Sequence, residues 1–416
     1  MPNLPNLQEC TGCGACAQLC PKGAIHLTED AERFIIPQID ASECIECGLC
    51  AKRCPQINSI SDNYKPVQRA YALISKDDRN VSSSGGAFSV FARYVLKYEG
   101  VVFGAAFYQQ NEEGDYIRCF PKLRHVWIEK VNDLDLLRGS KYLQSEIGQS
   151  YKACKKFLNM GKMVLFTGTP CQIAGLYQYL GQRHEGRLLT LDLVCHGVPS
   201  YALFASYLTK LNKAFNIDSS SVNTIIDFRF RNLSSWDYRT AAKISETKTW
   251  KRLEQEKNIY MKAFFRKLIF RESCYECHYS NMNRVGTFTI ADYWGIGKHG
   301  YKFSKNISSG VSLVIDNRGI MPDIFTELGK FAYIEERPLE EGRIDNYNLN
   351  SPSVRPTERD TAVCDMLDKN INIKDYAVKY KMLDNRIQHL LKNTFKNILY
   401  KTWLYNAYKT LSYKCK

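Results

Sequence analysis

Runs of apolar residues in the middle of the chain alternate between the lengths typical of strands and of helices. Val101 to Phe107, Met163 to Phe166 and Leu188 to Val194 are short and almost wholly apolar, as expected for strands buried on both faces of a sheet. Helical stretches precede the first strand, at Ala87 to Tyr98, and follow the second, up to Leu180. This alternation predicts an α/β domain with a mainly parallel sheet, where ligands bind at the carboxyl ends of the strands.

The first sixty residues follow a different pattern, in which cysteines repeat. Two runs share the spacing C-x2-C-x2-C-x3-C-P, and Ala24 to Leu27 and Phe34 to Ile36 between them predict short strands. In such runs three thiolates bind one [4Fe-4S] cluster and the fourth binds the other. One cluster is therefore assigned to Cys10, Cys13, Cys16 and Cys54, and a second to Cys44, Cys47, Cys50 and Cys20. Residues 5–60 resemble the bacterial two-cluster ferredoxins, so an α+β ferredoxin-type domain is expected.

Four of the other cysteines lie in turns or at ligand spacing. Cys171 and Cys195 lie in Gly- and Pro-containing turns after predicted strands, and Cys274 and Cys277 form a C-x2-C after a helix predicted at Asn258 to Arg271. Together they predict a third [4Fe-4S] cluster, with zinc as the main alternative. The C-x2-C-H at this place also has the form of a c-type haem signature, which requires export. We interpret Cys119, Cys154, Cys364 and Cys415 as packing or surface thiols.

Two turns at helix starts are candidates for binding phosphate. Ser83 to Gly86 precedes the first predicted helix, and Thr167 to Thr169 follows a predicted strand. Free N–H groups at helix starts bind phosphates, so both turns are candidates to hold a dinucleotide such as FAD, although Gly-Gly before a helix is more often a plain turn. His196 is either a turn residue that hydrogen-bonds to the backbone or a proton donor beside a flavin.

These motifs, taken in order, resemble a known family. Along the chain they follow in the order Ser84-Gly85-Gly86, Lys141-Tyr142, Thr167 to Gln172, Cys195-His196-Gly197, Cys274-x2-Cys277 and Ala291 to Gly295. This order resembles that of the beta subunit of the coenzyme F420 hydrogenase/dehydrogenase family. The resemblance covers about residues 65–350. It implies FAD, at least one [4Fe-4S] cluster and electron transfer between them. It also makes Ser83, Ser84, Gly85, Gly86, Lys141, Tyr142, Thr167, Gly168 and Thr169 candidate FAD contacts, and places Asp292 and Trp294 near the flavin or cluster.

Charge separates the two ends of the chain. Residues 1–60 carry four Lys or Arg against seven Asp or Glu, whereas residues 371–416 carry ten Lys or Arg against two Asp. A helix expected from Asn385 would either lie on anionic lipid, a peripheral membrane contact, or pack on its own domain with solvated lysines, which we favour. No nucleic-acid motif accompanies the charge, so no nucleic-acid partner is expected. The start of the chain lacks a signal-peptide pattern, and the reduced thiols expected of a metal site favour the cytoplasm.

The sequence therefore predicts three parts: a ferredoxin domain at 1–60, a larger FAD- and cluster-binding α/β domain at 65–355, and a basic helical C-terminal tail at 356–416. A polar linker, Asn58 to Pro66, joins the first two. The leading hypothesis is an oxidoreductase that takes electrons from an external donor, such as ferredoxin or a reductase, and reduces a small-molecule acceptor. Family members in surface-polysaccharide gene sets suggest a metabolite of that synthesis. The alternatives are a subunit that uses coenzyme F420 and a non-catalytic electron-transfer partner.

Overall fold

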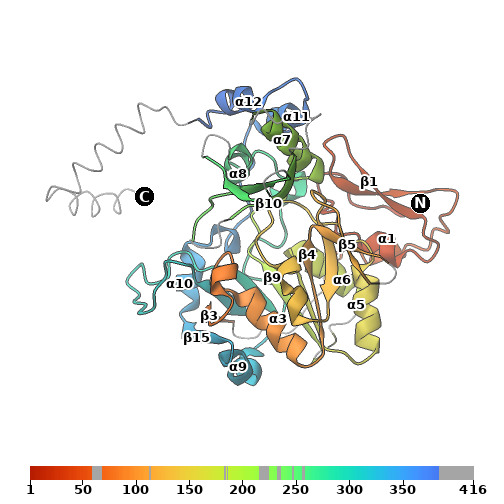
Figure 1. Ribbon diagram of the computed structural model, residues 1–416. Helices are drawn as coiled ribbons and strands as arrows, with labels where there is room; N and C mark the ends of the chain where they lie inside the picture. Colours follow the sequence, from red (N-terminus) through yellow and green to blue (C-terminus); the bar gives the residue numbers. More distant parts are fainter. Residues whose placement is uncertain are drawn as a thin grey trace, which may run out of the picture.

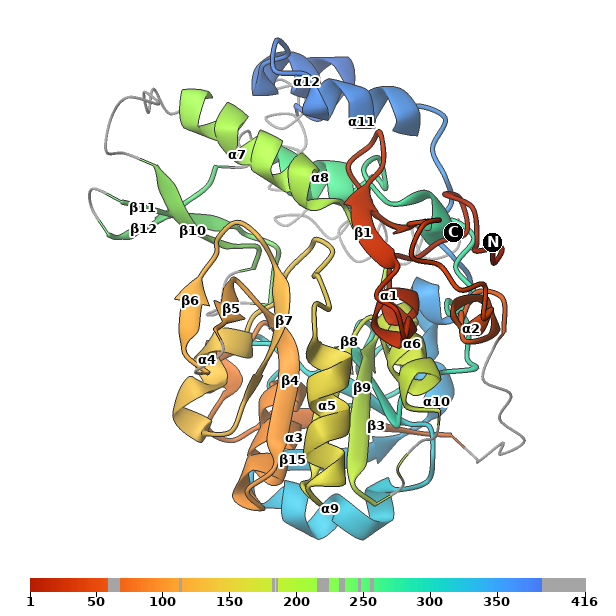
Figure 2. The ribbon, with the colours of Figure 1, turned by 90° about the vertical axis from the view of Figure 1, so that its right-hand side faces the viewer.

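The computed structural model describes residues 1–58, 68–111, 114–181, 184, 186–214, 224–231, 236–245, 248–254 and 258–383 (Figure 1). Most of the predicted linker and the helix expected from Asn385 lie outside these residues. The described part consists of a small N-terminal module, a central sheet with helices on both faces, and a layer of helices and short strands above one edge of that sheet (Figures 1 and 2).

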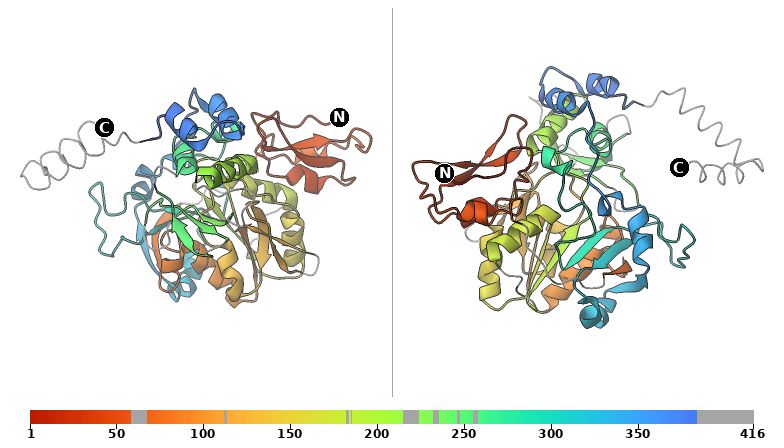
Figure 3. Two further views of the ribbon diagram at one scale, coloured as in Figure 1. Left: turned by 45° about the horizontal axis from the view of Figure 1, so that its top comes forward. Right: turned by 180° about the vertical axis from the view of Figure 1, so that it is seen from behind.

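The N-terminal module contains both strands predicted there. β1 (Ile25–Glu29) pairs with β2 (Ile35–Ile39) as an antiparallel hairpin, and each strand begins one residue later than expected. Two short helices, α1 (Ala15–Leu19) and α2 (Leu49–Lys52), lie within the two cysteine runs. The module stands at one side of the molecule, where α1 contacts the central domain (Figure 3).

The central sheet has eight strands with a parallel centre and antiparallel edges. β4, β8, β9 and β13 run parallel, which confirms the predicted α/β domain. The antiparallel strands, β7 on one side and β14, β3 and β15 on the other, were not predicted. In order across the sheet the strands are β15 (Ala332–Arg337), β3 (Arg69–Ser75), β14 (Ser312–Asp316), β13 (Phe288–Asp292), β9 (Leu188–Leu193), β8 (Val164–Gly168), β4 (Val101–Ala106) and β7 (Arg124–Ile128).

Both faces of this sheet are buried because successive apolar side chains point to opposite sides. Val102 and Leu165 pack toward α3, whereas Val101, Phe103 and Phe166 pack toward α5 and α6. Figure 2 shows α5 in front of the strands and α3 behind them. The helices on one face are α3 (Ala87–Lys97), α4 (Leu134–Leu137) and α9 (Met321–Gly329), and those on the other are α5 (Ser150–Asn159), α6 (Pro170–Leu180) and α10 (Leu339–Ile344).

A second layer with its own apolar core covers the carboxyl edge of the parallel strands (Figure 2). The helix predicted to reach Arg271 ends earlier, at Phe265, because Lys267 adopts a left-handed backbone with φ 61° and turns the chain. This layer contains α7 (Tyr201–Ala214), α8 (Ile259–Phe265), α11 (Arg359–Leu367), α12 (Ile373–Lys379) and the antiparallel strands β10 (Ile225–Arg229), β11 (Ala241–Ile244) and β12 (Trp250–Arg252).

The remaining elements are short. They are the strands β5 (Tyr108–Gln110) and β6 (Tyr116–Arg118) and the 3₁₀ turns η1 (Arg79–Val81), η2 (Val131–Asp133), η4 (Glu272–Cys274) and η5 (Tyr347–Leu349). Among the described residues, none of the helices combines the length and the apolar character needed to cross a bilayer.

Candidate functional site

The two cysteine runs of the ferredoxin module fold alike. In each, a glycine with positive φ, Gly14 at 75° or Gly48 at 68°, turns the chain directly into a short helix. A side chain at either position would strain this left-handed backbone. The third cysteine of each run lies within the helix and the fourth follows its end, so the two fourth cysteines can reach across the module.

Thiols from the two runs do cross over in this way. Burial and repulsion from the nearby thiols of Cys10 and Cys54 raise the pKa of Cys16 to about 12. Burial raises the pKa of Cys50, and the thiol of Cys20 contributes to the shift. Cys54 therefore lies near thiols of the first run and Cys20 near a thiol of the second, as expected if each fourth cysteine binds the cluster of the other run.

Four further thiols meet at the carboxyl edge of the central sheet. Cys171 lies in the first turn of α6, Cys195 follows β9, and Cys274 and Cys277 lie at and after η4. Burial and the Cys277 thiol raise the pKa of Cys171 to about 11 and that of Cys274 to about 12. Burial and all three of the other thiols raise the pKa of Cys195. The structure thus brings together all four residues proposed for a third cluster.

No group of three His, Cys, Asp or Glu side chains in the described part of the chain is arranged to hold a single metal ion. A [4Fe-4S] cluster needs its ligands farther apart than a single metal ion does, because each of its four thiolates binds a different iron atom.

Two tyrosines lie between the first ferredoxin group and this third group. The Tyr151 hydroxyl is 3.1 Å from the carbonyl oxygen of Cys13 and 2.7 Å from that of Gln172. The Tyr279 hydroxyl donates to the carbonyl of Pro55. Burial raises the pKa of Tyr279, and the thiols of Cys171, Cys13, Cys277 and Cys54 add to the shift. Tyr279 is therefore close to ligands of both groups.

Helix α6 approaches the ferredoxin module closely because residue 175 is glycine. A Cβ atom at Gly175 would lie 3.1 Å from the Sγ atom of Cys13 and 2.8 Å from the Tyr151 hydroxyl. Cys171, one turn earlier on the same helix, belongs to the third group, so α6 connects the two groups directly.

A buried arginine joins the same two regions. Arg271 is 2% exposed, and its guanidinium donates to the carbonyl oxygens of Cys10 (2.8 Å) and Ile35 (2.5 Å) and to the amide oxygen of Gln144 (3.1 Å). Its positive charge also lowers the pKa of Cys274, against the larger effect of burial. Arg271 thus links the backbone of the first cysteine run to the loop that carries Cys274.

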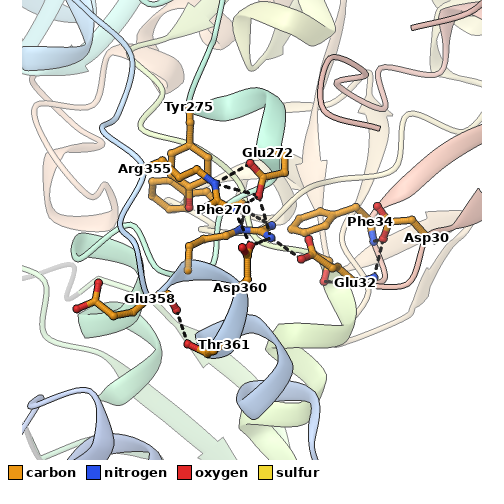
Figure 4. Close-up of polar contacts among 12 residues, drawn as sticks. Asp30, Glu32, Phe34, Phe270, Glu272, Tyr275, Arg355, Glu358, Asp360 and Thr361 are labelled. Atoms are coloured by element: carbon orange, nitrogen blue, oxygen red, sulfur yellow. Dashed lines mark hydrogen bonds and ion pairs between the residues drawn. The ribbon is translucent and has the colours of Figure 1, made fainter. Parts of the chain in front are cut away.

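A second buried arginine connects the module to α11. Arg359 is fully buried, pairs with Glu32 of the β1–β2 turn and with Glu272 of η4 (3.1 Å), and donates to the carbonyl of Phe270 at 2.7 and 3.1 Å. Figure 4 shows Glu32, Glu272 and Arg355 converging from three separate segments. We call Arg359, Glu32 and Glu272 the arginine clamp; it fixes the ferredoxin module on the central domain.

A cavity of about 320 Å³ lies over the carboxyl ends of the parallel strands, where the topology predicts a ligand. Cys171 and Cys195 line it, and so does Thr11 of the ferredoxin module. The predicted flavin-site residues that line it are Ser83, Ser84, Gly86, Lys141, Tyr142, Thr167, Gly168, Thr169, Asp292 and Trp294. Gly85 does not line it: a Cβ there would lie 2.1 Å from the carbonyl oxygen of Leu73, so this glycine lets the turn pack on the sheet.

One end of the cavity is polar. Gly86, with φ 91°, is the N-cap of α3, and the Ser83 hydroxyl accepts a hydrogen bond from the backbone N–H of Ser140 (3.0 Å). The neighbouring Lys141 is half-buried and donates to the carbonyl oxygens of residues 137–139, at 2.8–3.1 Å. Burial lowers the pKa of Lys141 to about 7. This end offers N–H groups and a cation to a phosphate.

The other end is aromatic and contains an ion pair. Asp292 accepts hydrogen bonds from Arg231 (2.5 Å) and from the indole N–H of Trp236 (2.6 Å). Trp236 stacks on Trp294 with ring centroids 4.7 Å apart, and Tyr238 lies 5.8 Å from Trp294. Flat rings of this kind suit a planar ligand.

Two histidines line the cavity as well. His196 points its Nδ1 at the amide oxygen of Asn348, and its carbonyl oxygen accepts a hydrogen bond from Ser353 (2.7 Å). Its role as a proton donor stays a prediction. Burial lowers the pKa of His125 to about 4, and its ring nitrogens contact the Thr167 carbonyl (2.9 Å) and the Ser145 hydroxyl (2.8 Å). His125 is therefore neutral and holds the end of β8 in place.

Sequence reasoning missed several residues of this site. Arg231, Trp236 and Tyr238 belong to a segment without a recognisable motif, and Gln144 and Thr11 face the cavity from different domains. The aromatic cluster at Trp236 to Tyr238 was the one usable signal, since a second tryptophan follows in the Asp292 to Trp294 motif.

The fold and the eight thiols of the N-terminal module define an iron–sulfur electron-transfer protein. Residues 9–57 match the family described as "4Fe-4S dicluster domain", and residues 161–342 match the carboxyl-terminal part of the beta subunit of coenzyme F420 hydrogenase/dehydrogenase. The chain therefore combines a segment similar to the two-cluster ferredoxin domains with a segment similar to the carboxyl-terminal part of the coenzyme F420 hydrogenase/dehydrogenase beta subunit.

One of the solved structures that match is a chain of low sequence identity. It belongs to the F420-reducing [NiFe] hydrogenase complex from Methanosarcina barkeri, is 18% identical, and aligns over 75% of this chain and 92% of its own length with a TM-score of 0.42. No curated protein matches the sequence.

Proposed function

We propose that the chain is an iron–sulfur flavoprotein oxidoreductase, which receives single electrons from an external donor and passes them in pairs to a small-molecule acceptor. In this proposal Cys171, Cys195, Cys274 and Cys277 hold a third [4Fe-4S] cluster, and the cavity holds FAD. One observation carries the proposal: Cys171 and Cys195 belong to the four-thiol group and also line the cavity. A cluster held there would lie directly beside a ligand in the cavity.

The cavity residues fit FAD at both ends. Its volume of about 320 Å³ lies within the range of small-molecule sites. The N-terminus of α3 and Lys141 would hold the pyrophosphate, while Tyr238 and Trp294 would contact the flat ring system. The buried Nη2 of Arg231, which has no hydrogen-bond partner among the described residues, offers a donor at the ring end.

FAD exchanges electrons singly or in pairs, so that it would join one-electron clusters to a two-electron acceptor. The chain supplies the surroundings. Lys141 offsets phosphate charge, neutral His125 adds no competing charge, and the layer of α7 and α8 excludes water from the edge of the sheet.

The arrangement of the thiols also supports a direction of electron transfer from one proposed cluster to the next. Cys47, a ligand of the second ferredoxin cluster, is exposed, whereas Cys13 contacts α6 beside Cys171. The second cluster is therefore the one nearest to solvent and to an external donor, and the first is nearest to the third group.

Anaerobic purification tests the proposal. We expect about twelve iron atoms per chain, from four per cluster, together with bound FAD. Protein that takes up no flavin, even after anaerobic reconstitution, would contradict it.

Coenzyme F420 as the acceptor is a second candidate, favoured by the family that residues 161–342 match. Anaerobic mixing with this coenzyme and a chemical reductant separates the two, because rapid turnover is expected only if the coenzyme is the natural acceptor. If the coenzyme is not turned over rapidly, a metabolite of surface-polysaccharide synthesis is the proposed acceptor.

A further inference from the structure

One guanidinium nitrogen at the aromatic end of the cavity has no close hydrogen-bond acceptor among the described residues. The Arg231 side chain is 2% exposed, its Nη1 pairs with Asp292 at 2.5 Å, and its Nε donates to the carbonyl of Asp237 at 3.3 Å. Its Nη2 carries two N–H groups, is buried, and has no close hydrogen-bond partner among the described residues. Burial raises the pKa of Tyr142, and the charge and hydrogen bonding of the nearby guanidinium oppose that rise, so the Tyr142 hydroxyl can approach at most one of the two N–H groups. Most buried side-chain polar atoms have a hydrogen-bond partner, so this nitrogen is a candidate donor to a ligand in the cavity.

The charge around Arg231 indicates which acceptor is suitable. Asp292 neutralises the guanidinium and also accepts from Trp236, so the pair carries no net charge. A neutral pair that still has a free N–H group suits a carbonyl oxygen better than a phosphate. The phosphate-binding features lie at the other end of the cavity, where Lys141 has no ion-pair partner within the described ranges.

The walls beside Arg231 suit a flat ring. Its guanidinium lies over the Tyr238 ring, 4.7 Å from the centroid, and Tyr238 in turn lies beside Trp294. Tyr142 and Phe264 complete this end, with ring centroids 4.8 Å apart, and both belong to the apolar cluster that includes Cys274. A planar group bound here would therefore lie next to the third thiol group.

We propose that Arg231 Nη2 donates a hydrogen bond to a ring carbonyl of a planar heteroaromatic group bound against Trp294 and Tyr238. Given the proposed function, on which this inference rests, that group is the isoalloxazine of FAD, and the carbonyl lies on its pyrimidine edge. Arg231 is then the residue that fixes which edge of the ring faces Asp292 and which side faces the thiols.

Binding of two probes to the reconstituted full chain tests this assignment. ADP carries the adenosine and pyrophosphate of FAD but no flavin ring. We expect Arg231→Met to weaken FAD binding at least about tenfold, the effect of losing a hydrogen bond from a charged donor, and to leave ADP binding unchanged. Lys141→Met is the matched control, since it should weaken both probes.

Removal of Arg231 leaves the Asp292 carboxylate buried and unpaired, so the single variant could fail to fold. The double variant Arg231→Met/Asp292→Asn, compared with Asp292→Asn alone, removes the same N–H without leaving a buried charge. Iron content and thermal melting identify the folded variants.

The outcomes are distinct. If the parent protein binds FAD and the folded Arg231 variants bind it equally well, or lose FAD and ADP in parallel, the assignment of Arg231 is wrong and the proposed function stands. If the parent protein binds ADP but no FAD, the proposed function itself fails.

Discussion

The ferredoxin module and the cavity build their sites in opposite ways. In the module, eight thiols come from two runs that share one spacing, and Gly14 and Gly48 give both runs the same backbone. At the cavity, the lining residues and the neighbouring four-thiol group come from segments far apart in the chain, brought together by the parallel strands. Local spacing therefore encodes the first site, whereas topology encodes the second.

The sharpest way to separate the two sites is to remove ligands from one of them. Cys274→Ala/Cys277→Ala should lower the iron content from about twelve to about eight atoms per chain, because one four-iron cluster is lost. Iron and labile sulfide assays of anaerobic protein measure this change.

Cys364→Ala is the matched control, since this exposed thiol lies in α11 and lines neither site. Unchanged iron in the double variant, with one zinc lost instead, would replace the third cluster by a zinc site. Loss of all iron would show that the two sites do not assemble independently.

The arginine clamp tests whether the module is a fixed part of the central domain. Arg359→Ala should lower the free energy of unfolding by about 3 kcal/mol, because it leaves the Glu32 and Glu272 carboxylates and the Phe270 carbonyl without a buried partner. Urea unfolding under anaerobic conditions measures the shift.

Arg355→Ala removes a neighbouring guanidinium that pairs with Glu272 but is 36% exposed, so a loss below about 1 kcal/mol is expected. Equal losses of unfolding free energy in the two variants would mean that the buried Arg359 stabilises the contact between the module and the central domain no more than the exposed Arg355 does.

The affinity for FAD should depend on pH because of Lys141 at the polar end of the cavity. The pKa of Lys141 is lowered to about 7, and a bound pyrophosphate would raise it again. FAD affinity should therefore be highest below pH 7 and fall as the pH rises toward the pKa of the complex, by about tenfold for each unit between the two pKa values.

Calorimetric titration of FAD from pH 6 to pH 9 measures this slope. His125, with its pKa near 4, stays neutral throughout and contributes nothing. In Lys141→Met the affinity should be lower and independent of pH; a slope that persists in this variant would assign the proton to another group.

Of the changes proposed, truncation of the basic tail is expected to have the smallest effect. If the helix predicted from Asn385 packs on its own domain, truncation there leaves co-sedimentation with anionic liposomes unchanged. Reduced pelleting of the truncated chain would favour the membrane-binding alternative.

The sequence predicted the parts of the molecule whose signal is local. The ferredoxin hairpin, β4, β8, β9 and α3 were each expected within about three residues of their observed bounds, because apolar periodicity and cysteine spacing act over short distances. The direction of β3 and β14 escaped prediction because it depends on pairing between segments more than two hundred residues apart.

The same division holds within the site. Cys171 and Cys195 were recognisable from their turns, and Asp292 and Trp294 from the family resemblance. Arg231 and Trp236 were not, because their role comes from contacts made only after β13 has been placed in the sheet. A lone arginine in a polar segment carries no sign that one of its N–H groups will be left unpaired.

The order of strands across the central sheet also has a consequence during synthesis. β3, which follows the ferredoxin module, lies between β14 and β15 and can pair with neither until the ribosome has translated the distant segments that contain them, up to residue 337. The module at residues 1–58 depends on no such late strand for its hairpin. Because nascent domains fold as they emerge, the module can form and acquire its iron first, while the sheet that supports the cavity closes only near the end of translation.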